Sequence, residues 1–274
     1  MESNPTERSA MRRKLTDPYC TGILSKDLPT ELARLQALER WADPTSKAII
    51  QRLPMRIDWS CLEMGAGAGS MAYWLAERCP RGHVVAADID PRYLDAGRAP
   101  NLEIATIDLV REGFPRASFD LIHTRLVLSH IPQRDEILKR AVTWLKPGGS
   151  IVVEDYYVLP LEHFPYEEMK RVFGAFVQTL STQGSDGHWA RRIPAKLASF
   201  GIGEMRIVSS PVTIGLGQPA DEVWHLGFEQ FAPHLVKNGS LTADQVAAYR
   251  ALSKPDAIDV PWIQISVSGR RLKS

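Results

Sequence analysis

The sequence predicts an α/β fold built on a largely parallel sheet. Between residues 60 and 157, short apolar runs typical of buried strands alternate with segments of helical periodicity. A glycine-rich stretch, LEMGAGAGS at residues 62–70, joins the first apolar run to the first helical segment of this series. When a helix separates two successive strands, the chain crosses back over the sheet and the two strands run parallel. Such crossovers are right-handed.

Composition narrows the class of protein. The 274 residues are 44% hydrophobic and 24% charged, enough for one large domain or a domain with an appended piece. With 33 basic and 32 acidic residues the formal net charge is +1, so no nucleic-acid or membrane partner is indicated and a small-molecule partner is expected. A homodimer is left open.

Localisation follows from two absent patterns. The first residues hold no apolar signal segment, and no run of about 18 uncharged apolar residues occurs, so we expect a cytoplasmic protein. Cys20, Cys61 and Cys79 lack metal-ligand spacing, and we expect reduced thiols and no metal site.

The first part of the chain precedes the predicted sheet. Residues 1–16 are polar and charged, and we expect a flexible arm. Residues 17–56 are predicted to form an N-terminal helical lid of two helices, LPTELARLQALERWADP and, after Pro44, SKAIIQRL.

The next elements alternate in type. CLEMG is the first strand, and SMAYWLAERC is a helix with Ser70 as its N-cap. HVVAADI is the second strand, and PRYLDAGR is predicted to be a helix capped by Asp90, with Pro91 in its first turn. LEIATIDL and FDLIHTRL follow as strands three and four, RDEILKRAVTWL as a helix, and SIVVEDYYV as strand five.

The pattern changes after strand five. A longer amphipathic helix runs from about Met169 to Leu180, and WARRIPAKLASFG follows as another helix; this segment is expected to cover a pocket. EMRIVSSPVTI is read as strand six, residues 219–252 as two helices, and WIQISVSGRR as the last strand.

Three acidic residues indicate what the glycine-rich stretch holds. Ligands of such sheets bind beyond the carboxyl ends of the strands, where Glu63, Asp88 and Asp108 stand after or near the ends of strands one to three. A carboxylate beside the glycines repels a pyrophosphate and favours a cationic or zwitterionic ligand. Asp88 is suited to accept ribose hydroxyl protons, and Asp108 those of an exocyclic amine.

Other interpretations stay open for the same residues. Gly67, Gly69 and Ala72 fit the dinucleotide fingerprint G-x-G-x-x-A, so a nicotinamide-dependent oxidoreductase is an alternative. Asp88 could cap the helix that follows it, and Asp108 could cap a turn.

The order and spacing of the motifs carry a resemblance. CLEMGAGAGS, VVAADIDPRYL, ATIDL, FDLIHTRLVLSHI and WLKPGGSIVVEDYY resemble the successive motifs of class I S-adenosylmethionine-dependent methyltransferases, over roughly residues 58 to 157. The later part resembles bacterial small-molecule methyltransferases of the secondary-metabolite type. The resemblance implies a Rossmann-like sheet of seven strands, the last antiparallel, within residues 57–274, with helical inserts after strands five and six at about 160–200 and 219–252.

The resemblance also implies a cofactor, S-adenosylmethionine, with S-adenosylhomocysteine as its product. Glu63 and the glycine backbone would hold the amino-acid end, Asp88 the ribose and Asp108 the adenine. Arg125 would lie beside the methionine portion. The full set of expected cofactor-binding residues is Glu63, Gly65, Ala66, Gly67, Gly69, Asp88, Ile89, Asp108, Leu109 and Arg125.

The implied reaction is an in-line methyl transfer to a small molecule, with a hydroxyl of a natural product as the expected acceptor and N- and C-acceptors left open. A hydroxyl nucleophile benefits from a base. His130 is favoured over His123, which falls within a strand pattern, and over His188. Asp155 is the second expected catalytic residue. The expected substrate-binding residues are Tyr19, Tyr156, Tyr157, Phe173, Trp189 and Arg192. A cyclase that keeps the cofactor site without methyl transfer is a further alternative.

Overall fold

The computed structural model describes residues 22–252 and 258–272. The expected arm at residues 1–16, Tyr19 and Cys20 lie outside the described residues. The described parts contain one seven-stranded sheet with the order β3-β2-β1-β4-β5-β7-β6. The strands are β1 (Ser60–Met64), β2 (His83–Asp88), β3 (Leu102–Thr106), β4 (Phe119–Arg125), β5 (Leu145–Val158), β6 (Ile202–Ile214) and β7 (Asp259–Arg271).

Strand directions confirm the predicted sheet. The four pairs that join β3, β2, β1, β4 and β5 are parallel, whereas β7 pairs antiparallel with both β5 and β6. The order reverses at β1, because β2 lies on one side of it and β4 on the other. In open α/β sheets the ligand site lies at this reversal, beyond the carboxyl ends of the strands.

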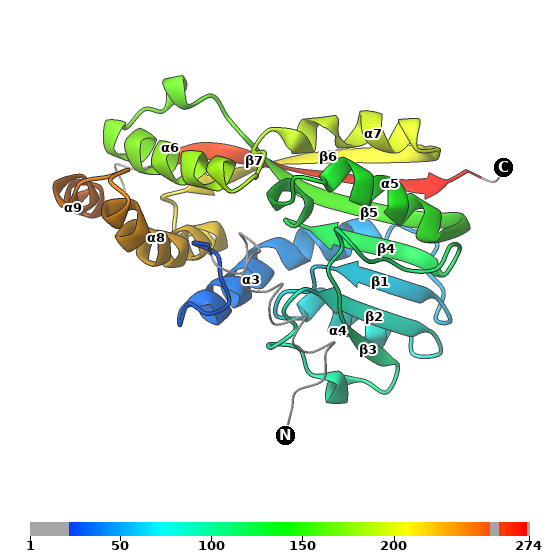
Figure 1. The fold of residues 1–274 in the computed structure, drawn as a ribbon. Helices are drawn as coiled ribbons and strands as arrows, with labels where there is room; N and C mark the ends of the chain where they lie inside the picture. The colour runs from blue at the N-terminus through cyan, green and yellow to red at the C-terminus, as the bar shows by residue number, and fades with distance from the viewer. Residues whose placement is uncertain (1–21, 253–257, 273–274) are drawn as a thin grey trace.

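Helices cover both faces of the sheet (Figure 1). On one face, α4 (Ser70–Arg78) and the last turn of α3 (Glu31–Ile50) pack on Cys61 and Leu121. On the other, α5 (Arg134–Trp144) and α7 (Ile193–Ser199) pack on the neighbouring residues, such as Leu62 and Ile122. Because successive side chains along each strand point to opposite faces of the sheet, the core on the sheet is divided into two layers.

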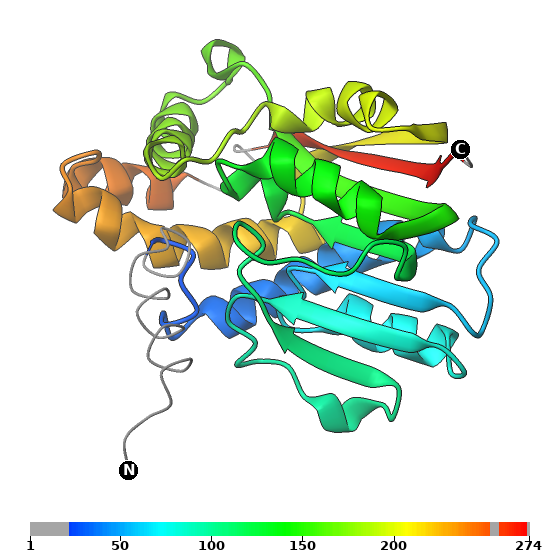
Figure 2. The same ribbon diagram turned by 45° about the vertical axis from the view of Figure 1, so that its right-hand side comes forward.

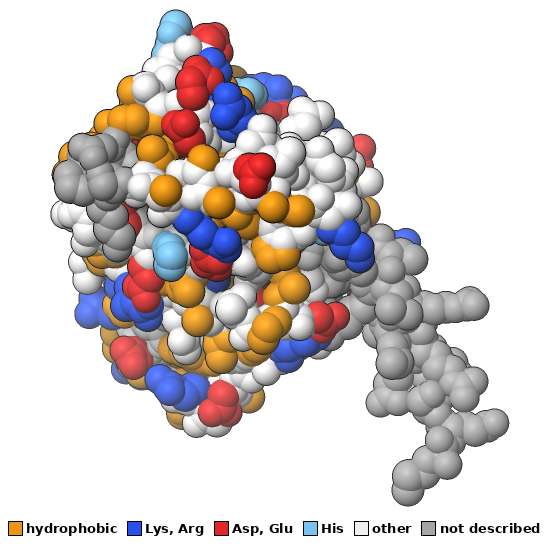
Figure 3. Space-filling model, turned by 90° about the vertical axis from the view of Figure 1, so that its left-hand side faces the viewer, with side chains coloured by type: hydrophobic (Ala, Val, Ile, Leu, Met, Phe, Trp, Pro, Cys, Tyr) orange, Lys and Arg blue, Asp and Glu red, His pale blue; other side chains and the backbone are white. Residues whose placement is uncertain are grey.

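Three further helices gather beyond one end of the sheet, in both Figure 1 and Figure 2. They are α6 (Glu167–Thr182), α8 (Pro219–Lys237) and α9 (Ala243–Ala251), and α3 packs along α8. They confirm the predicted inserts after strands five and six and enclose a third core rich in aromatic side chains. On this end of the molecule, hydrophobic side chains are interspersed with charged ones (Figure 3).

The prediction of separate helices before and after Pro44 is wrong. Within residues 22–59, one continuous helix, α3, runs through Pro44. A proline removes one backbone hydrogen bond, here to the carbonyl of Arg40, but both halves of α3 are held by burial, as at Leu35 and Ile50. The Ser46 hydroxyl also donates to the Ala42 carbonyl (3.2 Å) across the proline.

The predicted helix PRYLDAGR is also wrong. Only the 3₁₀ turn η1 (Ala96–Arg98) forms there, and its cap is Asp95, whose carboxylate accepts from the Gly97 N–H (2.8 Å). Asp90 instead accepts from the Arg92 guanidinium (2.9 Å), which also donates to the carbonyl of Lys26 (3.1 Å). Tertiary hydrogen bonds thus hold the segment in turns.

The predicted N-cap of α4 is wrong as well. Gly69 is the cap, with φ of 104°, so Ser70 lies inside the helix. Two acids of α3 bind Ser70: Glu39 accepts from its backbone N–H (3.0 Å) and Asp43 from its hydroxyl (2.9 Å). The orphan donor at the start of α4 is therefore satisfied by another helix. Short 3₁₀ turns also occur: η2 (Leu128–His130), η3 (Leu161–His163) and η4 (Trp189–Arg192).

Candidate functional site

A cavity of about 930 Å³ lies at the carboxyl ends of the parallel strands. Its wall combines the segments that follow β1 to β4 with residues of α3, α6 and α8. The volume is at the upper end of the range typical for small-molecule sites. Nine of the ten residues expected at the cofactor line this wall, and the tenth, Gly69, caps α4 beside it.

The glycine-rich stretch turns sharply at the end of β1. Gly65 and Ala66 both donate their N–H groups to the carbonyl of Ala87 (2.8 and 3.0 Å). Gly65 has φ of 74°, and a Cβ there would lie 2.2 Å from Val127 Cγ2. Gly67 has φ of 61° and a nearly empty Cβ position, with Leu35 at 3.9 Å. The first glycine is thus required for close packing, and the second leaves space beside the backbone.

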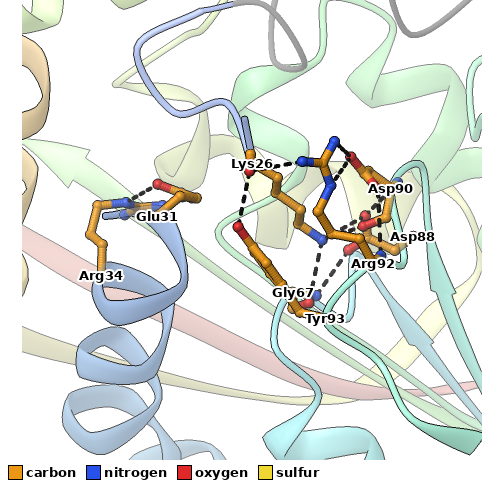
Figure 4. A network of polar contacts seen from close by, with 8 residues as sticks. All are labelled: Lys26, Glu31, Arg34, Gly67, Asp88, Asp90, Arg92 and Tyr93. Atoms are coloured by element: carbon orange, nitrogen blue, oxygen red, sulfur yellow. Dashed lines mark hydrogen bonds and ion pairs between the residues drawn. The ribbon is translucent and has the colours of Figure 1, made fainter. Parts of the chain in front are cut away.

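Asp88, at the end of β2, is held by three donors (Figure 4). One carboxylate oxygen accepts from the Gly67 N–H (2.9 Å), and the other from the Asp90 N–H (2.8 Å). The Lys26 ammonium forms an ion pair with it (3.1 Å) and donates to the carbonyls of Gly67 (3.3 Å) and Asp90 (2.6 Å). Both charged side chains are buried.

Lys26 belongs to the segment before α3 and was not among the predicted site residues. Its own carbonyl accepts from Arg92 and from the Tyr93 hydroxyl (2.9 Å), so the segment is fastened to the end of β2 (Figure 4). A second buried ion pair follows at the start of α3, where Glu31 and Arg34 make two hydrogen bonds (2.8 and 2.7 Å).

Glu63, on β1, binds a buried histidine. Its carboxylate lies 2.6 Å from Nδ1 of His123 on β4, and Nε2 of His123 lies 2.9 Å from Glu154 on β5. Glu154 also accepts from the Ser266 hydroxyl of β7 (2.6 Å). His123 is fully buried and does not line the described cavity wall, in agreement with its prediction as a residue packed in the sheet.

The pKa values of His123 and Glu154 are set by their contacts with each other and with their neighbours. Burial alone would lower the pKa of His123, but the Glu63 and Glu154 carboxylates raise it to about 9. Burial alone would raise the pKa of Glu154, but the hydrogen bonds from His123 and Ser266 lower it to about 2. His123 is therefore an imidazolium at neutral pH.

The remaining acid and the arginine also line the cavity. Asp108, after β3, accepts from the Val110 N–H (2.9 Å), so it caps a turn, as in the alternative interpretation, while facing the cavity. Arg125, at the end of β4, donates to Ser46 (2.8 Å) and pairs with Asp43 (2.9 Å) of α3. These contacts join α3 to the end of β4 at the cavity wall.

The two expected catalytic residues lie at different depths. His130 lines the cavity, 3.1 Å from the Ser185 hydroxyl and 5.8 Å between ring centroids from Tyr156. Burial, with Arg34 and Arg134 adding to it, lowers the pKa of His130 to about 4. Asp155 is buried behind the described wall and accepts from the backbone N–H groups of Ser129 (2.9 Å) and Tyr156 (3.0 Å). Burial raises its pKa to about 6.

Some of the expected substrate-binding residues line the cavity, and others do not. Tyr156 and Phe173 line the cavity, whereas the described wall does not include Tyr157, Trp189 or Arg192. Trp189 is fully buried in the α5 layer and donates to Asp135 (2.8 Å), and Tyr157 packs against His188. Arg192 forms an ion pair with Asp186 at the surface. The role of these three residues in substrate binding stays a prediction.

Several residues of the wall were missed by sequence reasoning. In α3, Arg34, Leu38 and Trp41 face the cavity at spacings of four and three, which is the period of one helix face and could have identified them. In α8 the wall residues Trp224, Gly227 and Phe231 have the same signal. Phe173 stacks on Trp262 of β7 (5.5 Å between centroids), which extends the aromatic wall.

The described residues hold neither a cluster typical of a metal site nor a helix typical of a membrane span. Residues 22–252 and 258–272 contain no group of three metal-ligating side chains. In the same residues, no helix combines the length and the apolar character needed to cross a membrane.

Comparisons with known proteins agree with the geometry. A family model described as a methyltransferase domain matches residues 62–153. The methyltransferase str2 of Strobilurus tenacellus is 33% identical over 154 residues, which cover 53% of this chain and 54% of that protein. Str3 of the same organism is 30% identical over 144 residues. The chain thus matches about half the length of each of these relatives.

Solved structures share the fold. Geranyl diphosphate methyltransferase in complex with SAM has a TM-score of 0.54 and 14% identity, covering 91% of this chain and 94% of that chain. The [4+2]-cyclase SpnF has a TM-score of 0.55 and 15% identity, covering 85% and 82%. At these sequence identities, the similarity to the two structures shows a shared fold alone.

Proposed function

We propose that the protein is a class I S-adenosylmethionine-dependent methyltransferase, which the match of residues 62–153 to a methyltransferase-domain model supports, and that it transfers a methyl group to a hydroxyl of a small natural product. The observation that carries the proposal is the convergence of Glu63, Asp88 and Asp108 on one cavity around the glycine-rich stretch. Three carboxylates from three successive strand ends suit a ligand that bears a cationic amino acid, a ribose and an exocyclic amine.

The residues present fit this cofactor. Gly67 leaves open space beside the backbone, and Asp88 is fixed at the end of β2 by two backbone donors. In the proposed site, Glu63 faces the amino-acid end, Asp88 the ribose and Asp108 the adenine. The bound cofactor supplies an electrophilic methyl group on a sulfonium.

The acceptor is proposed to lie between β5 and the helices α6 and α8. Tyr156, Phe173 and Trp224 line this part of the cavity, and such a wall favours a flat, largely apolar molecule. Polar contacts come from His130 and Ser185, which hydrogen-bond to each other. The aromatic character supports a natural product, as does the similarity to the Strobilurus methyltransferases.

The residues of this chain act mainly by alignment and desolvation. The acceptor oxygen must lie in line with the transferred carbon and its leaving sulfur, and an acceptor that fills the cavity displaces water from that line. His130 is neutral at pH 7 and can accept the hydroxyl proton, but its pKa of about 4 makes it a weak base. Asp155 acts through the backbone of Ser129, which positions the turn that carries His130.

The test is methyl transfer from methyl-labelled S-adenosylmethionine to a panel of phenolic and aliphatic hydroxyl natural products. We expect label on at least one acceptor oxygen. We also expect Glu63→Gln and Asp88→Ala to weaken S-adenosylhomocysteine binding, with Glu103→Gln, an exposed acid of β3, as the matched control. Binding of S-adenosylhomocysteine without transfer to any acceptor would favour a cyclase, and unchanged affinity in both variants would refute the assigned cofactor site.

A further inference from the structure

A row of buried polar side chains crosses the sheet on the α3 side. Glu63 and His123 are paired neighbours of β1 and β4, and Glu154 and Ser266 are paired neighbours of β5 and β7. Apolar residues flank the row on the same face, among them Cys61 and Leu121. Four strands of the sheet therefore contribute to one continuous chain of hydrogen bonds.

Stability alone is a poor reason for this row. Removing charged groups from water costs several kcal/mol per ion, and replacing a buried ion pair with apolar side chains is often neutral or stabilising. His123 is fully buried, and so is Glu154. Within the described residues, the Glu63 end is the part of the row that reaches the cavity. The row therefore has its accessible end where the proposed cofactor places its amino-acid end.

The contact with His123 also fixes the Glu63 carboxylate. One oxygen lies 2.6 Å from Nδ1 of His123, so the acceptor capacity that remains on this carboxylate faces the cavity wall. Two carboxylates and one imidazolium leave one net negative charge in the row. The nearby charges of Arg125, also on β4, and Asp43 of α3 are paired with each other (2.9 Å).

We propose that His123 is a positioning residue of the cofactor site, which holds the Glu63 carboxylate in place to receive the ammonium group of the cofactor's amino-acid tail. The proposal rests on the proposed function and goes beyond it, because His123 itself does not touch the cavity as described. The effect of His123 is confined to ligands that carry the tail. A ligand with only the adenine and ribose portions depends on Asp88 and Asp108 and is unaffected.

The experiment compares two ligands by calorimetry: S-adenosylhomocysteine, which has the amino-acid tail, and 5′-methylthioadenosine, which lacks it. We expect His123→Asn to weaken S-adenosylhomocysteine binding by about tenfold or more, the size expected for a hydrogen bond to a charged group. Binding of 5′-methylthioadenosine should change by less than about twofold. Asp88→Ala should weaken both ligands.

Two further variants keep the test decisive. Thr124→Val is the matched control, because Thr124 is the buried neighbour of His123 and its hydroxyl has no partner among the described residues; it should change neither affinity. Glu154 lies on the side of His123 away from Glu63, and Glu154→Gln keeps the shape and removes one charge. It should weaken S-adenosylhomocysteine selectively, by several-fold, even if His123→Asn fails to fold.

The outcomes separate the two proposals. Failure of the unaltered protein to bind either ligand would overturn the proposed function together with the role of His123. Binding of both ligands by the unaltered protein, with His123→Asn and Glu154→Gln weakening both equally or neither, would overturn the role of His123 and leave the proposed function standing. Selective loss of S-adenosylhomocysteine supports the positioning role, since general damage to the fold would weaken both ligands.

Discussion

Gly65 combines two constraints at the start of the glycine-rich stretch. Its backbone is left-handed, and a side-chain carbon there would overlap Val127. We expect Gly65→Ala to lower the free energy of unfolding by about 2–4 kcal/mol, because overpacking and the unfavourable φ add. Urea denaturation measures the change.

The matched control is Gly239→Ala. Gly239 has a similar φ of 78° but nothing within 4 Å of the Cβ position. This variant should lose only about 1 kcal/mol, the cost of the backbone conformation. Equal losses in the two variants would show that Val127 imposes no constraint on Gly65.

His123 should make stability depend on alkaline pH. Its pKa rises from 6.5 to about 9 on folding because the Glu63 and Glu154 carboxylates favour the imidazolium. The stabilisation is complete below pH 6.5 and is lost as the pH rises toward 9, since only the folded state holds the proton in that window. The loss is of order 3 kcal/mol. Urea denaturation between pH 6 and 9.5 measures it, and His123→Asn should remove this component; an unchanged pH slope would contradict the prediction.

At the scale of elements, the segment before α3 is tied to the sheet by Lys26. We expect Lys26→Met to lower the free energy of unfolding by about 3 kcal/mol, because it leaves the buried Asp88 without its cation. Hydrogen exchange of the backbone amides of residues 22–30 should become faster. Lys47→Met is the control: Lys47 pairs with Asp43 (3.0 Å) but is one-third exposed, so less than about 1 kcal/mol is expected. Similar losses in both would argue against a special role of Lys26.

The interior proline of α3 predicts a gain in stability. Pro44 is exposed, so Pro44→Ala removes no buried contact and restores a backbone donor to the Arg40 carbonyl. We expect the free energy of unfolding to rise by about 2 kcal/mol. Pro219→Ala serves as the control, because Pro219 is in the first turn of α8, where proline is tolerated. Thermal unfolding of both variants would contradict the prediction if Pro44→Ala gave no gain over Pro219→Ala.

Elements also show what a single sequence can predict. Burial of one or both faces imposes a periodic sequence pattern on the strands and on most helices. The structure confirms the elements that were predicted from this pattern. The failures at Pro44 and at residues 91–98 arise where contacts between distant segments outweigh local signals, as with Arg92 and the Lys26 carbonyl. The convergence of Glu63, Asp88 and Asp108 on one cavity was predictable, because the strand ends meet at one edge of any parallel sheet. The contact of Lys26 with Asp88 was not predictable, because no local pattern relates the two residues.

At the scale of the whole molecule, the cavity joins parts of the chain that are far apart in sequence. Leu24, Gly65 and Phe231 all contribute to its wall. A ligand that fills it should therefore stabilise the fold globally. We expect S-adenosylhomocysteine at 100 times its Kd to raise the free energy of unfolding by about 2.7 kcal/mol. Thermal unfolding with and without the ligand measures this, and Asp88→Ala should abolish the gain. Protection from hydrogen exchange confined to residues 65–70 would contradict a global effect.

The position of β7 has a consequence for biosynthesis. β7 lies between β5 and β6, although it follows β6 in the chain, and β6 pairs with no other strand in the described sheet. During translation, β6 therefore cannot join the sheet until residues 259–271 have left the ribosome. Until then the edge of β5 is unpaired and open to association with other chains, and Glu154 lacks its hydroxyl donor from Ser266. Both the pairing of the β5 edge and the completion of the polar row beneath the cavity thus depend on β7.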